Sequence, residues 1–226
     1  IDLLVSQGME QEEALYKVLK EMITASKNIR FEGDGYSDEW KEEAMRRGLT
    51  NISHVPEAIM RFNDSQSREV LIGENIFNEN ELICRIEVEL EKFTKKVQIE
   101  SRVLGDLAIN HIVPTAVIYQ NRLLENLRGL RETFSQVEYE MLGADRRELV
   151  KEIQFRILEI KQLVREMTEA RRISNRLTSQ VEKAYSYEEK VRPYMEQIRE
   201  HIDHLELEID DEIWPLPKYR ELLFTK

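Results

Sequence analysis

The longest helical pattern in the chain runs from about Asn78 to Phe134, and it limits the fold more than any other feature. Apolar residues recur in it at intervals of three and four, which is the spacing of one helix face and not of a strand. That face consists of Leu82, Ile86, Leu90, Phe93, Val97, Leu104, Leu107, His111, Thr115, Ile118, Arg122, Leu127, Leu130 and Phe134. Asn78 and Glu81 have the spacing of a capping box at its start. A straight helix of this length would extend roughly 85 Å, whereas a compact globule of this chain length is roughly 45 Å across.

Pro114 is the position at which we expect this helix to bend. Proline lacks the N–H that the carbonyl of Asn110 would accept, and its ring crowds the preceding turn, at about 3 kcal/mol in an ideal helix. Gly105 adds a second weak point. The segment around Pro114 lacks the residues of a reversing loop, so we predict one kinked helix rather than two antiparallel helices.

Composition favours an acidic helical protein. Charged residues make up 34% of the 226 residues, with 8 Gly and 5 Pro, and the net charge of −11 argues against nucleic acid and against anionic membrane surfaces as partners. No apolar run approaches the roughly 20 residues of a membrane span. The single cysteine, Cys84, permits no internal disulfide and fits the cytoplasm. Because the chain begins at Ile1 rather than at a methionine, we expect a fragment of a longer protein.

A smaller helical and loop segment is predicted before the long helix. Its first helix, from Met9 to about Ile29, has an apolar stripe formed by Leu15, Val18, Leu19, Met22 and Ile23. The two glycines of the next stretch, Phe31–Trp40, predict a tight loop. Ser37 or Asp38 can then cap a short helix that stops at Gly48.

The boundary between two domains is placed after residue 77. Pro56 is suited to the start of a short helix, and the polar stretch 63–68 resembles a connector. We therefore assign residues 1–77 to an N-terminal segment and residues 78–226 to a helical bundle.

Two further helices are predicted after the long one. Asp145 and Glu148 have the spacing of a second capping box, and the apolar pattern that follows continues to about Tyr187. Pro193 is suited to the first turn of a last helix, which ends at Trp214. The two halves of the kinked helix can serve as two helices of a bundle. The predicted fold is therefore all-α, an up-and-down, four-helix-like bundle with the N-terminal segment on one side.

Candidate chemical sites are few. His201 and His204 lie one helical turn apart with Glu208 near them, so they are weak metal candidates, although a solvated polar face is the preferred interpretation. His111 is interpreted as a core histidine, and the acidic run 206–212 as a structural or partner-facing segment. We find no nucleophile elbow and no Cys/His dyad, and therefore predict no catalytic residue.

Several separated blocks carry a family resemblance. The stretches Phe31–Trp40, Arg102–Ala116 with Tyr119–Asn121, and Asp210–Phe224 together resemble the C-terminal region of type III glutamine synthetases. The resemblance implies an intact enzyme, a glutamate–ammonia ligase, that uses ATP and divalent metal, usually magnesium. It also implies that the catalytic, cofactor-binding and metal-binding residues lie in a domain upstream, so none is transferred to this chain and the fragment alone is expected to be inactive.

The resemblance further implies an assembly of two stacked hexameric rings. On that basis the expected partners are the upstream catalytic domain and neighbouring subunits. The predicted interface residues are aromatic, namely Tyr36, Trp40, Trp214, Tyr219 and Phe224. The alternative is a stand-alone helical module that binds another protein.

Overall fold

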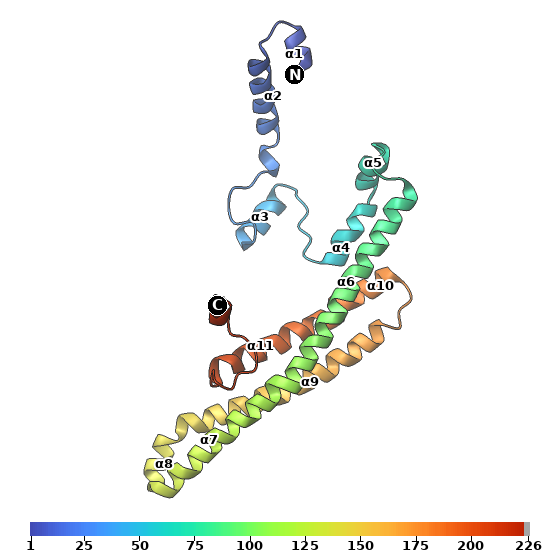
Figure 1. Ribbon diagram of the computed structural model, residues 1–226. Helices are drawn as coiled ribbons and strands as arrows, with labels where there is room; N and C mark the ends of the chain where they lie inside the picture. Colours follow the sequence, from blue (N-terminus) through green and yellow to red (C-terminus); the bar gives the residue numbers. More distant parts are fainter. Residues whose placement is uncertain (224–226) are drawn as a thin grey trace. The chain divides into compact units, whose positions relative to one another are not determined.

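The structure is a computed structural model, and it describes residues 1–223, with the backbone alone described at residues 219 and 220 (Figure 1). The all-α prediction is confirmed, since the described residues form helices and no strand. None of the described helices is both long and apolar enough to cross a membrane. The chain forms two compact units, Ile1–Ser53 and His54–Lys226.

The first unit contains three α-helices and one 3-10 turn. They are α1 (Asp2–Ser6), α2 (Gln11–Ala25), η1 (Lys27–Ile29) and α3 (Asp38–Arg46). The side chain of Ser37 accepts a hydrogen bond from the N–H of Trp40 at 3.2 Å and so caps α3, as predicted. Gly48 follows the helix with φ of +71°, a conformation that glycine adopts without strain.

The second unit opens with short helices that the sequence analysis identified only in part. They are α4 (Val55–Met60), η2 (Arg61–Asn63) and α5 (Ser65–Gly73). The polar stretch 63–68 was therefore wrongly interpreted as a connector. Asp64 has the extended backbone of an N-cap residue, and α5 then carries Leu71 and Ile72 onto a buried cluster centred on Leu82.

The long helical run is present and begins at the predicted capping box. It comprises α6 (Glu79–Leu107), the π-helical turn η3 (Ala108–Ile112) and α7 (Val113–Thr133). The Glu81 N–H donates to the Asn78 side chain at 2.9 Å, and the Asn78 N–H donates to the Glu81 carboxylate at 2.8 Å. Because α4 and η2 pack against α6, the compact units divide before residue 54, earlier than the boundary suggested after residue 77.

A π turn precedes Pro114. The N–H of Val113 donates to the carbonyl of Ala108, five residues earlier, so the turn is wider than an α turn. The buried face departs from the predicted one on both sides of this turn. Gly105 and Ile112 are buried while His111 and Ile118 are exposed, although the predicted Thr115 and Leu127 are buried. The prediction of a core histidine at His111 is therefore wrong.

The remaining helices differ from the predicted boundaries. They are α8 (Gln136–Leu142), α9 (Ala144–Ser174), α10 (Gln180–Ser186), the π turn η4 (Tyr187–Val191), α11 (Arg192–Glu208) and α12 (Tyr219–Leu222). The capping box lies at Ser135 and Glu138, and Asp145 is a first-turn residue that caps nothing. The predicted helix to Tyr187 is interrupted at 175–179. Pro193 lies in the first turn of α11, as predicted, but α11 follows η4 without a break.

Three antiparallel helical runs form the core of the second unit. Figure 1 shows the chain reversing at α8 and again between α9 and α10. The two halves of the long run have different main partners, because α7 packs against α9 while α6 packs against α10. The principal core contains Val97, Ala108, Ile112, Ala116, Ile153, Ile157, Ile160, Leu163, Met167, Tyr187, Val191, Ile198, Ile202, Leu205, Ile209 and Trp214.

Candidate functional site

The first candidate surface is the apolar face of α2. Its side chains are far more exposed than the amphipathic pattern alone would suggest: Leu15 is 44%, Leu19 46%, Met22 63% and Ile23 51% exposed. We call these four residues the α2 stripe. In residues 1–53, all of which the structure describes, Ala14 and Ala44 are the only buried hydrophobic residues. A continuous apolar face of this kind is typical of a helix that packs against another protein surface.

The glycine-containing loop presents one of the predicted interface residues fully. Tyr36 is 96% exposed, and its N–H donates to the Asp34 carboxylate at 2.9 Å, which fixes the turn. Trp40 is only half-buried and stacks on Phe31 with ring centroids 4.4 Å apart. A Cβ at Gly33 would lie 2.5 Å from the Phe31 ring, so a larger residue there would require the ring to shift. The loop therefore leaves the Tyr36 side chain exposed, whereas Trp40 is partly buried within its own unit.

The C-terminal interface candidates have a different outcome. Trp214 is 8% exposed and packs in the principal core of the bundle, with the Lys218 ammonium 5.9 Å from its ring. Its predicted role as an outward anchor is therefore wrong, because the bundle itself uses the side chain. The side chain of Tyr219 and the whole of Phe224 lie outside the described residues.

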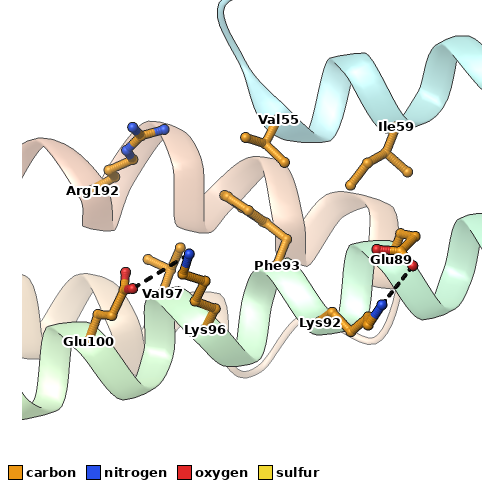
Figure 2. Close-up of a pocket in the computed structure, with 9 residues that line it drawn as sticks. All are labelled: Val55, Ile59, Glu89, Lys92, Phe93, Lys96, Val97, Glu100 and Arg192. Carbon is orange, nitrogen blue, oxygen red and sulfur yellow. Dashed lines mark hydrogen bonds and ion pairs between the residues drawn. The ribbon is translucent and has the colours of Figure 1, made fainter.

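A cavity of about 390 Å³ opens between α4, α6 and α11 (Figure 2). Figure 2 shows the Phe93 ring directed from α6 toward Val55 of α4. The cavity rim is charged, but its lysines have partners: Lys92 pairs with Glu89 at 2.8 Å, and Lys96 lies 3.9 Å from Glu100. The other lining residues are Ile59, Val97 and Arg192. Because the charged side chains at the rim pair with one another, we interpret this cavity as a gap between packed helices rather than as a catalytic pocket.

Beside this cavity lies a buried carboxylate that the sequence analysis did not identify. Glu188, in the π turn η4, is 7% exposed. It accepts from the Arg192 guanidinium at 2.9 and 3.1 Å, and it lies 3.1 Å from Nδ1 of His54. A buried carboxylate needs such partners to offset its desolvation. Glu188 thus fastens the start of α4 to the last helical run, and nothing in its sequence context distinguishes it from the many exposed glutamates.

The weak metal candidates have surroundings that disfavour a cation. Nδ1 of His201 lies 3.3 Å from the Arg156 guanidinium, and its ring meets Phe155 edge-on at 6.0 Å. Burial and the charge of Arg156 lower the pKa of His201. His204 is exposed. Within residues 1–223, no group of three or more His, Cys, Asp or Glu side chains is arranged to hold a metal ion.

Comparison with known proteins identifies the family. The family model described as "Glutamine synthetase C-terminal domain" matches residues 14–131, which is more than half of the chain. The chain belongs to this family. Over its full length it is 69% identical to a glutamine synthetase of Bacteroides fragilis (strain YCH46), and it is 29% identical over 222 residues to the Type-3 glutamine synthetase of Dictyostelium discoideum. The resemblance found in the sequence blocks is confirmed.

This glutamine synthetase C-terminal domain is much shorter than its relatives. It covers 31% of the length of the Bacteroides protein and 29% of that of the Dictyostelium protein, so it spans less than a third of these curated relatives. Of the chain itself, the two matches cover 100% and 96% respectively. Both compact units therefore fall within the region shared with those proteins.

Proposed function

We propose that this chain is the C-terminal helical module of a type III glutamine synthetase and that it serves assembly rather than catalysis. The observation that carries the proposal is the α2 stripe, because its apolar surface lies inside the family match and has no cover within its own unit. Burial of such a stripe against another surface is favourable at about 25 cal/mol per Å² of apolar area.

The intact enzyme is proposed to be a glutamate–ammonia ligase that uses ATP with magnesium. The relatives are named glutamine synthetases, which supports the ligase activity of the whole protein. The described residues contain no cluster fitted to a metal ion, so we assign no magnesium ligand to this module. The single cysteine suits a cytoplasmic enzyme.

The proposed partners are the catalytic domain of the same enzyme and neighbouring subunits in a double-ringed assembly. The α2 stripe and Tyr36 are the surfaces that support this proposal. The second unit adds an exposed apolar group at the α8 turn, formed by Phe134, Val137 and Met141. Apolar surfaces on two separate units suit a module that contacts more than one neighbour.

Deletion tests the role of the whole module. The parent enzyme with and without the segment 1–226 is assayed for glutamine synthesis from glutamate, ammonia and ATP with magnesium, and its mass in solution is measured. We expect the deletion to abolish both the large assembly and the activity. An active, fully assembled enzyme without the segment would contradict the proposal and favour a module that binds an external protein.

Substitution tests the α2 stripe. Leu19→Glu in the parent enzyme places a charge in the centre of the stripe, and we expect loss of the large assembly with unchanged helix content. The matched control is Val103→Glu, which places the same charge at an exposed apolar position of α6. Equal behaviour of the two variants would show that the stripe has no special role.

A further inference from the structure

A polar contact joins α6 to the C-terminal end of α9 near the end of the bundle core. The Oδ1 atom of Asn175, directly after α9, accepts a hydrogen bond from the Tyr187 hydroxyl at 2.7 Å. The same oxygen lies 3.4 Å from the side-chain nitrogen of Gln98 on α6. Tyr187 is fully buried and Asn175 is exposed, so this group of residues lies where the core meets the surface.

This contact brings two arginines into opposition. The two helices are antiparallel (Figure 1). The turn of α6 that follows Gln98 therefore lies opposite the turn of α9 that precedes Asn175. One turn after Gln98 is Arg102, and one turn before Asn175 is Arg171. Burial lowers the pKa of Arg171. The positive charge of Arg102 lowers this pKa further.

Neither arginine has a counterion among the described residues. No Asp or Glu oxygen of residues 1–223 lies within 4.0 Å of the Arg102 or Arg171 guanidinium, although the neighbouring Arg172 pairs with Glu169 at 3.5 Å. The chain carries 44 acidic residues and a net charge of −11. In so acidic a protein, two facing arginines without a carboxylate form a local positive site whose mutual repulsion an anion would relieve.

We propose that Arg102 and Arg171 bind a phosphoryl group, either free phosphate or the phosphate of a nucleotide. Each guanidinium presents a planar set of N–H donors that matches the oxygens of a phosphate. Two guanidinium groups balance a phosphate dianion, whereas a single carboxylate would leave one charge uncompensated. The Gln98 amide, one turn away on α6, lies on the same helix face. This inference is independent of the proposed role in assembly.

Titration with inorganic phosphate tests the site. The 226-residue chain is titrated by calorimetry at constant ionic strength, with sodium chloride as the compensating salt. We expect saturable binding of one phosphate per chain, weakened at least about tenfold by Arg171→Gln and by Arg102→Gln, since each removes charge-assisted hydrogen bonds. Arg172→Gln is the matched control and should bind as the unsubstituted chain does. The Arg102 side chain is exposed, so its variant keeps the test valid if Arg171→Gln fails to fold.

Parallel titrations with ATP and ADP distinguish the two sources. Nucleotide binding that is tighter than phosphate binding and lost in both variants assigns the site to a nucleotide. Equal affinities assign it to the phosphate group alone. Absence of saturable binding by phosphate and by both nucleotides overturns the proposal. Equal weakening of phosphate binding by Arg172→Gln also overturns it. If the Arg102 and Arg171 variants bind phosphate normally but change the mass of the chain in solution, the pair is a subunit contact and the proposal is wrong.

Discussion

At the scale of single residues, Glu188 shows how a carboxylate is retained between helices. Its 7% exposure would be costly for an unpaired charge, but Arg192 and His54 both lie within 3.1 Å of its oxygens. The His54 contact joins residues 134 positions apart in the chain. No sequence pattern predicts such a pair, because the two side chains meet only after the two elements have packed together.

Glu188→Gln should lower the free energy of unfolding by about 1–3 kcal/mol, because the amide leaves a donor facing donors in a buried site. Urea unfolding followed by circular dichroism measures the change. Glu196→Gln is the control, since Glu196 is exposed and lies 3.8 Å from the same arginine. Equal stability of the two variants would show that Glu188 does not fasten α4 to the last helical run.

His201 gives the bundle a predicted pH dependence. Burial and Arg156 lower its pKa in the folded chain below the ordinary value of 6.5, so near that value the unfolded chain binds more protons than the folded chain. Stability should therefore fall as the pH drops below about 6.5. In urea unfolding at a series of pH values, His201→Asn should reduce this fall between pH 7 and pH 5. An unchanged pH profile in the variant would contradict the assignment, and His204→Asn, at an exposed position, is the control.

At the scale of helices, the two prolines inside long runs follow one pattern. Pro114 and Pro193 each stand two residues after a π turn, η3 or η4, and each is the second residue of the α-helix that follows. At that position a missing N–H is tolerated, because the wider turn has already changed the hydrogen-bond spacing. An irregularity at Pro114 and a place for Pro193 in the first turn of a helix were both predicted, but the π turn before each proline was not.

The different burial of two isoleucines around η3 makes a direct prediction. Ile112→Ala should cost about 2–5 kcal/mol, as expected for a fully buried side chain. Ile118→Ala should cost less than about 0.5 kcal/mol, because Ile118 is 51% exposed. Urea unfolding of both variants measures the difference. Equal costs of the two substitutions would contradict this assignment of the buried face.

Much of the helix pattern could be predicted from the sequence, and the errors have local causes. Caps at Ser37 and Asn78 were found because they depend on residues three positions apart. The break at 175–179 was missed because the apolar spacing continues through it. Trp214 was assigned to an interface because its burial depends on how the last segment returns to the bundle. The α2 stripe was predicted as a helix face, but its exposure could be seen only in the structure.

At the scale of the whole molecule, the two compact units have very different cores. Unit 1 buries Ala14 and Ala44, whereas the second unit buries more than twenty hydrophobic side chains among its described residues. Segments below about 70–80 residues rarely stabilise themselves with a single core, and alanines supply little buried area. The first unit should therefore depend on a partner surface for most of its stability.

The two tryptophans allow this difference to be measured. Trp40 lies in the first unit and Trp214 in the second, and the chain has 2 Trp in all. In urea, the fluorescence of Trp214→Phe, which reports Trp40, should change at lower denaturant than that of Trp40→Phe, which reports Trp214. Coincident transitions would mean that the units unfold together and would contradict the prediction.

The π turns also have a consequence for insertions and deletions. Each turn holds one residue more than a regular helix would need, and the wider turn accommodates that residue without rotating the helix that follows. Deleting one residue from 108–112 would therefore let the segment close as a regular α turn and leave the face of α7 in place, whereas adding one would turn that face by about 100°. Relatives that keep the downstream core should either keep the length of these segments or be one residue shorter in them.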